Sequence, residues 1–280
     1  MKSTQELAAE QAAYWNGPGG KMWLAAYERI QRGIAGFSEV VLKAANAQAG
    51  ERVLDVGCGT GGTTAELAKA VGASGHVLGV DISEPLIGAA RAQKLANASF
   101  EVGDAARHRF EAQAFDLVFS RFGVMFFADP VAAFQNIRRA LKPAGRLVFL
   151  CWRPPSENPW GAVPMRAAQP HLPPMERPGP EDPGQYAFGD RARVERILSE
   201  AGFVGLSIEP VDLMLNQGKD VADVLERIGE FGPLARAFKD AAPEQVVQAK
   251  AAIGEALKPY ATADGVKLAG ACWLVRARPA

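Results

Sequence analysis

Short apolar runs alternate with segments of helical spacing between residues 52 and 151. This alternation predicts a doubly wound α/β core, in which parallel strands are joined by right-handed helical crossovers. Residues 4–48 have a helical pattern that is interrupted by Asn-Gly-Pro-Gly-Gly at positions 16–20. Residues 220–258 return to helical spacing, with breaks at Gly232-Pro233 and Ala242-Pro243. The pattern therefore predicts a central sheet with helical segments before and after it.

The most informative motif is the glycine-rich turn after the first of these strands. Residues 53–64 read Val-Leu-Asp-Val-Gly-Cys-Gly-Thr-Gly-Gly-Thr-Thr. Gly57, Gly59 and Gly61 remove Cβ atoms where the backbone must turn tightly and a ligand must approach it closely, and Gly62 extends the run. The turn indicates a site for a nucleotide-type cofactor.

Two cofactor classes fit the glycine spacing alone. Gly57, Gly59 and Gly62 also satisfy the G-x-G-x-x-G spacing of dinucleotide-binding dehydrogenases, with Asp81 about twenty residues further on. Asp55, two residues before the first glycine, would repel a pyrophosphate. It would attract the ammonium group of an amino acid, or a water that it holds.

Acidic residues also follow the next two strands. Residues 75–82 end in Asp81, which can accept hydrogen bonds from two ribose hydroxyls, and Ser83-Glu84-Pro85 then starts a helix. The short strand at 99–102 leads to Gly103-Asp104, where a third carboxylate can meet the amino group of an adenine. Three acids thus follow three consecutive strand ends.

This combination resembles the class I methyltransferases that use S-adenosylmethionine. The resemblance continues through residues 115–120 as a fourth strand, Ala128-Asp129-Pro130 as a helix start, residues 141–149 as the turn into a fifth strand, and residues 201–203 as the entry to a sixth. Pro143-Ala144-Gly145 replaces the family's common Pro-Gly-Gly, a change confined to a turn. The resemblance implies a seven-stranded sheet with helices on both faces, in which the last strand lies antiparallel beside the fifth.

The resemblance also assigns the cofactor-binding residues. It places Asp55, Gly57 and Gly59 on the methionine side, Asp81 on the ribose, and Asp104 with Ala105 on the adenine, with Ile82 packed against the adenine ring. The full set is Asp55, Gly57, Cys58, Gly59, Gly61, Asp81, Ile82, Asp104, Ala105 and Ser120.

The expected domain organisation follows from these segments. We expect an N-terminal helical lid at 1–48 and a Rossmann-like cofactor-binding core at 49–151. A proline-rich insertion, which would serve as a substrate lid, follows at 152–190. Residues 191–212 and 266–280 would complete the core sheet, and residues 213–265 between them would form a helical insertion. Residues 152–190 hold ten of the nineteen prolines, which predicts an irregular, extended excursion. A helix is expected near 191–201, and strands near 206–213 and 270–277.

The amino-acid composition limits the classes of partner that the protein is expected to bind. The chain has 280 residues, 48% of them hydrophobic, and 31 basic residues balance 31 acidic ones, so no global positive field favours nucleic acid. The first ten residues lack an apolar signal core, and no segment reaches about 18 uncharged apolar residues. We expect a cytoplasmic monomer or homodimer without membrane insertion. The three cysteines and three histidines lack the spacing of a metal site.

Ligands of open α/β sheets bind beyond the carboxyl ends of the strands, so the residues after the fourth and fifth strands are candidates for the methyl acceptor. Arg121 suits an anionic or carbonyl-bearing acceptor, or alternatively pairs with a nearby carboxylate. Aromatic and apolar neighbours suit an apolar acceptor or simply the core. The candidate substrate residues are Trp15, Arg121, Phe122, Met125, Trp152 and Trp160, with Phe126 as a further candidate for the pocket wall and Phe127 favoured as core.

The expected reaction is in-line displacement, in which an acceptor oxygen, nitrogen or carbon attacks the methyl group of the sulfonium. A general base is needed only if the acceptor must lose a proton, and His171, Glu157 and Arg121 are the catalytic candidates, with His108 in a solvated loop. Two alternatives remain: a protein of the same fold that binds S-adenosylmethionine for other chemistry or regulation, and a nicotinamide oxidoreductase. A macromolecular acceptor is disfavoured because Ser120-Arg121-Phe122-Gly123 replaces the Asn/Asp-Pro-Pro-Tyr type of motif.

Overall fold

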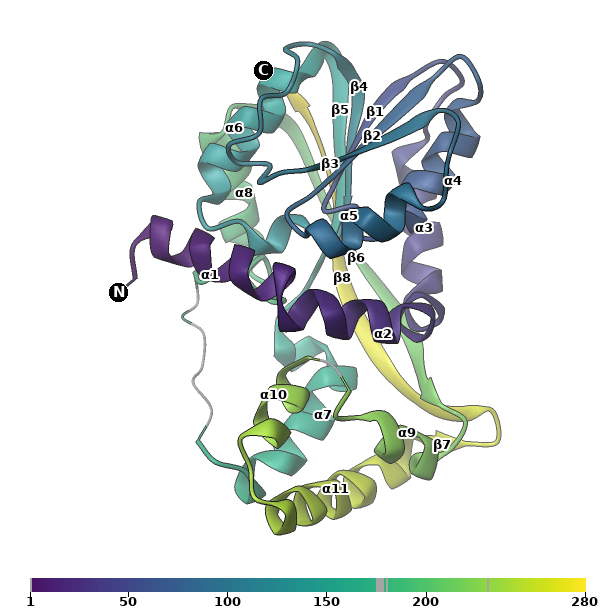
Figure 1. Ribbon diagram of the computed structural model, residues 1–280, viewed down its shortest axis with the longest axis vertical. Helices are drawn as coiled ribbons and strands as arrows, with labels where there is room; N and C mark the ends of the chain where they lie inside the picture. Colours follow the sequence, from purple (N-terminus) through teal and green to yellow (C-terminus); the bar gives the residue numbers. More distant parts are fainter. Residues whose placement is uncertain (1, 175–178, 180, 231) are drawn as a thin grey trace.

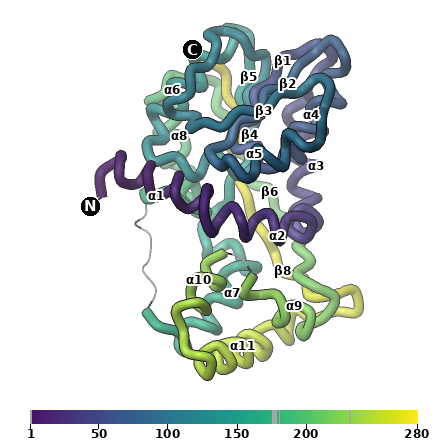
Figure 2. The backbone as a smooth tube through the Cα atoms, in the orientation of Figure 1, coloured from purple at the N-terminus to yellow at the C-terminus, as the bar shows by residue number. Residues whose placement is uncertain are grey.

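The computed structural model describes residues 2–174, 179, 181–230 and 232–280. Figure 1 shows an upper lobe built around a twisted sheet and a lower lobe built mainly of helices, with two N-terminal helices crossing the region between them. Figure 2 shows the same division along the backbone, with two long strands running from one lobe into the other.

The sheet has the order β3-β2-β1-β4-β5-β8-β6, and β7 pairs with β8 at the lower end. The first five strands are parallel, and β8 is antiparallel to both β5 and β6. The pairing of β8 with β5 is the one that the resemblance implied for the last strand. The strands are β1 (Arg52–Val56), β2 (His76–Asp81), β3 (Ala98–Val102), β4 (Phe115–Arg121), β5 (Leu141–Trp152), β6 (Phe203–Gly218), β7 (Ala261–Thr262) and β8 (Gly265–Pro279).

The predicted count of seven strands needs one correction. The sheet is eight-stranded because the two-residue strand β7 forms a hairpin with the start of β8. Thr262 Oγ1 donates to the Gly265 carbonyl at 2.8 Å, which closes the turn between them. So short a strand has no alternation of its own that a sequence pattern could reveal.

Helices cover both faces of the sheet, which confirms the doubly wound α/β class. One face carries α3 (Ala35–Ala45), α4 (Gly62–Val71) and α5 (Glu84–Arg91), and the other carries α6 (Pro130–Ala140) and α8 (Arg191–Glu200) (Figure 1). The helices begin where the sequence predicted. Asp129 caps α6 by accepting a hydrogen bond from the Ala132 amide at 2.9 Å, and proline stands in the first turn of both α5 and α6.

The lower lobe has a separate hydrophobic core. It is built from α7 (Pro159–Ala168), α9 (Val221–Arg227), α10 (Gly232–Lys239) and α11 (Pro243–Leu257), together with the lower parts of β6 and β8. Gly232 and Pro243 each begin a helix, as expected from the two breaks in the pattern. Among the described residues there are also four single-turn 3-10 helices: η1 (Val124–Phe126), η2 (Pro155–Glu157), η3 (Gln169–His171) and η4 (Lys258–Tyr260).

Two expectations about the second half of the chain are wrong. Strands β6 and β8 are about twice as long as predicted, because they pair with each other from Phe203 and Pro279 as far as Gly218 and Val266. Residues 152–190 are not irregular throughout, because α7 lies within them and contains Pro164 in its interior. Pro159 in the first turn favours this helix. Residues 175–178 and 180 of that segment lie outside the described residues.

The N-terminal helices are α1 (Thr4–Asn16) and α2 (Pro18–Gly33). The predicted break at residues 16–20 is confined to Gly17, since Pro18 occupies the first turn of α2 and Gly19 and Gly20 continue it. A second break, which the sequence pattern did not indicate, falls at Ile34 before α3. In the part of the chain that the structure describes, no helix is both long and apolar enough to cross a membrane.

Candidate functional site

The glycine-rich turn joins the end of β1 to the start of α4. Gly57, Gly59 and Gly61 have φ angles of +69°, +56° and +83°, in the left-handed region that favours glycine. A Cβ on Gly57 would lie 2.6 Å from the Cα of Gly123, in the turn that follows β4. The glycine at 57 is therefore required by the backbone on both sides, and it places the ends of β1 and β4 in direct contact.

The acids predicted at the strand ends lie along one edge of the sheet. Asp81, at the end of β2, accepts hydrogen bonds from the Gly59 amide at 2.8 Å and the Ser83 amide at 2.9 Å, and burial raises the pKa of its carboxyl group. Asp104 follows β3 and accepts from the Ala106 amide at 2.9 Å. The Ala105 carbonyl accepts from Asn136 Nδ2 at 2.7 Å, which fixes the backbone on the adenine side predicted for this edge.

Asp55 is fully buried at the end of β1. Its Oδ2 accepts hydrogen bonds from the hydroxyls of Thr63 and Thr64, at 2.8 and 2.7 Å, while its Oδ1 is buried without a hydrogen-bond partner among the described residues. Burial raises the pKa of Asp55 to about 6, and the two threonine hydroxyls partly offset that increase. One oxygen of this buried carboxyl group therefore has no hydrogen bond among the described residues.

The raised pKa of Asp55 predicts a pH effect on stability. The unfolded chain ionises this carboxyl near its ordinary value, while the folded protein keeps it protonated up to about pH 6. Its contribution is therefore fully present below about pH 4 and is lost as the pH rises to about 6. As the pH rises across this interval, the melting temperature of Asp55→Asn should therefore increase relative to that of the unmodified protein, because asparagine has no carboxyl group to ionise. Asp116→Asn is the control with the opposite pH dependence. Hydrogen bonding and an ion pair with Lys142 lower the pKa of Asp116, so its contribution to stability is present above about pH 4 and is lost as the pH falls below that value.

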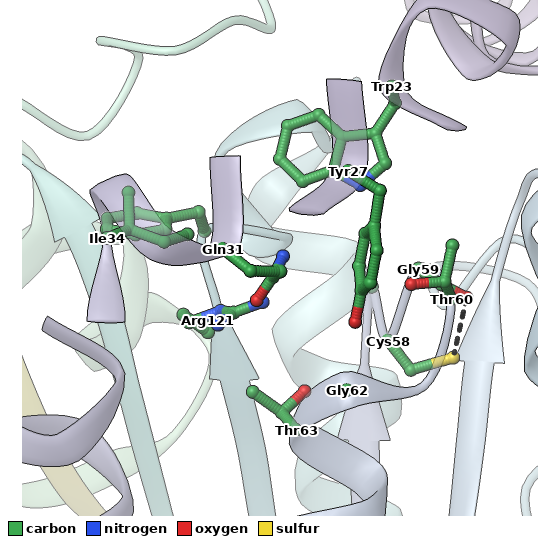
Figure 3. Close-up of a pocket in the computed structure, with 12 residues that line it drawn as sticks. Trp23, Tyr27, Gln31, Ile34, Cys58, Gly59, Thr60, Gly62, Thr63 and Arg121 are labelled. Atoms are coloured by element: carbon green, nitrogen blue, oxygen red, sulfur yellow. Dashed lines mark hydrogen bonds between the residues drawn. The ribbon is translucent and has the colours of Figure 1, made fainter. Parts of the chain in front are cut away.

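A face of α2 covers the glycine-rich turn. The pocket between them is lined by Tyr27, Gln31 and Ile34 from this region, by the turn itself, and by Arg121 (Figure 3). A Cβ on Gly62 would lie 2.6 Å from Tyr27 Oη, so the helix packs closely on the turn. The enclosed volume is about 30 Å³, room for roughly one water molecule. This volume is far below the roughly 300 to 1,000 Å³ of pockets that hold small molecules.

Sequence reasoning missed these α2 residues. The pattern contained a signal for them, since Trp23, Tyr27 and Gln31 recur at intervals of four and lie on one helical face. The signal was ambiguous because the same spacing is typical of core residues. Thr60, Gly62 and Thr63 of the turn also line the pocket.

The junction between α1 and α2 is hydrogen-bonded to the residues that follow Asp81. The Trp15 carbonyl accepts from Ser83 Oγ at 2.7 Å. Asn16 donates through Nδ2 to the Ile82 carbonyl and accepts through Oδ1 from the Glu84 amide, both at 2.9 Å. These contacts place the predicted lid beside the edge of the sheet at which the ribose and adenine residues were expected.

Aromatic side chains fill the space after β4 and β5. Phe122 stacks on Trp152 with ring centroids 4.6 Å apart, and Trp160 lies 4.9 Å from Trp152. Phe122 also lines the pocket and has a φ angle of +64°, which is strained for a residue with a Cβ. Trp15 makes an edge contact with Phe126 at 5.2 Å.

Three further residues that the sequence proposed for the cofactor or substrate site are buried. Met125 is buried, and its sulfur accepts the Trp152 amide at 3.4 Å. Ser120 is buried and its hydroxyl donates to the Val56 carbonyl at 2.8 Å, which ties β4 to β1. Cys58 lines the pocket, and burial raises the pKa of its thiol well above the ordinary value.

The acid–base candidates lie outside this pocket lining. His171 ends η3 in the lower lobe, where η3 contacts α11. Glu157 forms an ion pair with Arg153, which also pairs with Asp212 at 2.7 Å. His108 contacts Glu101 at 2.9 Å beyond the end of β3. Of the catalytic candidates, only Arg121 reaches the pocket. No cluster of three potential metal ligands occurs among the described residues.

Comparison with known proteins identifies the core. Residues 53–145 match the family model described as "Methyltransferase domain". A demethylmenaquinone methyltransferase from Staphylococcus saprophyticus is 39% identical over 112 residues, which cover 39% of this chain and 48% of the relative. The chain thus spans about half the length of the curated relatives that it matches.

Solved structures agree on the fold. The YcgJ protein from Bacillus subtilis superposes with a TM-score of 0.56 at 16% identity, over 86% of this chain and 97% of that one. Phosphoethanolamine N-methyltransferase 2 from Haemonchus contortus, solved with phosphomonomethylethanolamine and S-adenosylhomocysteine, gives a TM-score of 0.53 at 20% identity, over 88% of this chain and 53% of that one.

Proposed function

We propose that the protein, whose residues 53–145 match a methyltransferase domain, transfers a methyl group from S-adenosylmethionine to an oxygen, nitrogen or carbon atom of a small, partly apolar molecule. The observation that carries the proposal is the row of carboxylates at the ends of β1, β2 and β3 beside a turn of left-handed glycines. The Asp81 carboxylate suits the ribose hydroxyls, and the Asp104 region suits the adenine.

The location of Asp55 supports a charged amino acid group in preference to a pyrophosphate. Its unpartnered Oδ1 can accept a hydrogen bond from an ammonium group, whereas a phosphate oxygen at the same place would be repelled. This argues against the nicotinamide alternative, in which a pyrophosphate would occupy the glycine-rich turn.

When bound, S-adenosylmethionine supplies an already activated methyl group. The residues of this chain then have to align an acceptor and exclude water, and well-aligned partners gain roughly 7 to 11 kcal/mol from positioning alone. Phe122, Trp152 and Trp160 form an apolar wall beside the pocket, which supports an acceptor with apolar surface. The α1–α2 segment is the proposed lid, because it packs on the turn and is hydrogen-bonded beside Asp81.

Thermal unfolding with added ligand tests the cofactor assignment. S-adenosylhomocysteine should raise the melting temperature progressively with concentration, because a ligand that binds only the folded state stabilises it. NAD at the same concentrations should leave the melting temperature unchanged. The opposite pair of results would assign the site to a nicotinamide cofactor.

Methyl transfer is tested separately from binding. The protein is incubated with S-adenosylmethionine labelled in its methyl group and the protein-free, low-molecular-weight fraction of a cell extract. Label should move into small, solvent-extractable molecules, and Asp81→Ala should prevent this. Tight cofactor binding without any transfer of label would favour the alternative in which the same fold serves other chemistry or regulation. The three free, buried cysteines are compatible with the cytoplasm as the proposed location.

A further inference from the structure

Arg121 is a partly buried cation without a carboxylate partner. It ends β4, and its Nη1 donates to the hydroxyl of Ser38 on α3 at 2.6 Å. No carboxylate oxygen of the described residues lies within 4.0 Å of it. Burial lowers the pKa of its guanidinium group. Burying a charged group costs free energy unless the charge is paired. We therefore expect the Arg121 guanidinium group to bind an anion.

Two neighbouring polar groups in the pocket are also unpartnered. Gln31 Nε2 from α2 and Thr60 Oγ1 from the glycine-rich turn are buried without hydrogen-bond partners among the described residues. Both residues line the pocket together with Arg121, and Figure 3 shows the Gln31 side chain beside the arginine. Buried polar groups are nearly always hydrogen-bonded in native proteins. Three hydrogen-bond donors thus border one small pocket.

The charge pattern around the pocket is that of an amino acid site. Arg121, Gln31 and Thr60 line the pocket and offer donors to an anion. Asp55 lies buried just before the glycine-rich turn, outside the lining of the pocket, and its Oδ1 has no hydrogen-bond partner among the described residues. The charge of Asp55 acts on Arg121 without a direct ion pair between them. An α-amino acid group carries a carboxylate and an ammonium on the same carbon. It therefore provides an anion for the donors and a cation for the Asp55 carboxyl group. A single anion, such as a phosphate or a phenolate, would leave Asp55 unsatisfied.

Resting on the proposed function, we propose that Arg121 and Gln31 bind the α-carboxylate of the amino acid end of S-adenosylmethionine. The sequence assigned Arg121 to the methyl acceptor instead. The structure favours the cofactor because the glycine-rich turn lines the same pocket as the guanidinium group. The first residues of α4 also line this pocket, and the partial positive charge of a helix N-terminus favours an anion there.

The test compares two ligands that differ only in this carboxylate. Titration calorimetry measures the affinities of S-adenosylmethionine and of decarboxylated S-adenosylmethionine for the full-length protein. The unmodified protein should bind the carboxylated ligand at least tenfold more tightly, because a hydrogen-bonded ion pair is lost with the carboxylate. Arg121→Gln should reduce this ratio of affinities to within about threefold of unity, mainly by lowering the affinity for the carboxylated ligand.

Arg153→Gln is the matched control. Arg153 follows the end of β5 on the same edge of the sheet, but it is already paired with Glu157 and Asp212. This variant should keep the ratio of the unmodified protein. Arg121→Lys should keep part of the ratio, because it preserves the charge but not the planar pair of donors.

The outcomes separate this inference from the proposed function. An Arg121→Gln protein that keeps the full ratio overturns the inference and leaves the function intact, since Arg121 would then serve the acceptor or the fold. If circular dichroism shows that Arg121→Gln is unfolded, Gln31→Ala decides in its place: a reduced ratio supports the inference, and an unchanged ratio overturns it. Absence of binding of either ligand to the unmodified protein would overturn the proposed function itself.

Discussion

Gly57→Val is expected to weaken the binding of S-adenosylhomocysteine by at least a hundredfold. The φ angle of +69° at this position is strained for valine, and the new Cβ would lie 2.6 Å from the Cα of Gly123. The Cβ is attached directly to the backbone of the turn, which the Gly57 amide ties to the Val80 carbonyl of β2, and the atom that it meets is also backbone, so the turn and the end of β4 must separate. Titration calorimetry measures the affinity, and circular dichroism checks that the variant is folded.

Gly72→Val is the control for backbone strain alone. Gly72 has a φ angle of +66°, close to that of Gly57, but an added Cβ there meets nothing within 4 Å. It caps the far end of α4, away from the pocket. This variant should lose about 1 to 3 kcal/mol of stability, because its φ of +66° and ψ of −172° lie in a backbone region that is open essentially only to glycine, while it keeps its affinity. Tight binding by a folded Gly57→Val protein would contradict the role assigned to the turn.

Asp81→Ala is expected to weaken the same binding by more than tenfold. A charged carboxylate that accepts ribose hydroxyls contributes roughly 1.5 to 3 kcal/mol to binding. The structure adds a second cause, because Asp81 also holds the Gly59 amide at 2.8 Å and the Ser83 amide at 2.9 Å. Its removal therefore releases the glycine-rich turn as well as the proposed ribose contact.

Asp116→Ala is the matched control for Asp81→Ala. Asp116 also accepts a hydrogen bond from a backbone amide, that of Arg52 at 2.9 Å, but it lies at the start of β4, on the opposite edge of the sheet. This variant should lower the melting temperature and leave the affinity unchanged. If calorimetry gave the same affinity for Asp81→Ala as for the unmodified protein, the assignment of Asp81 to the ribose would be wrong.

Much of the upper lobe was predictable because its signals are local. Residues 53–56 are all buried, and three of the four are apolar, as expected for a strand covered on both faces. The glycines that follow have the φ angles that their residue type favours. Parallel strands end at one edge, so the acids after β1, β2 and β3 had to lie there together. The contact of Gly57 with Gly123 was not predictable, because it joins segments that are distant in sequence.

The lower lobe was harder to predict because tertiary contacts decide it. Helix α7 forms despite Pro164, and its Val163 packs in one core with Ile253 of α11 and Leu268 of β8. The extra length of β6 comes from pairing along β8 as far as Gly218. Local propensity carries no information about these partners. Proline content therefore suggested irregular structure where packing produced a helix.

The candidate site was only half visible in the sequence for a similar reason. The residues of the turn are contiguous, so their motif could be recognised. The α2 residues Tyr27 and Gln31 reach the pocket only because the chain folds back over the turn. The partner of Arg121 could not be inferred from its position after β4, since that position serves both cofactor and acceptor. The unpartnered atoms around it became evident only in three dimensions.

A crystal structure with S-adenosylhomocysteine bound is the most direct measurement of the central claim. We expect the ribose hydroxyls on the Asp81 carboxylate, the adenine beside Asp104 and Ala105, and the amino acid end between the glycine-rich turn and a displaced α2. A ligand bound away from the carboxyl ends of β1 and β2, with Asp81 free of contact, would contradict the account.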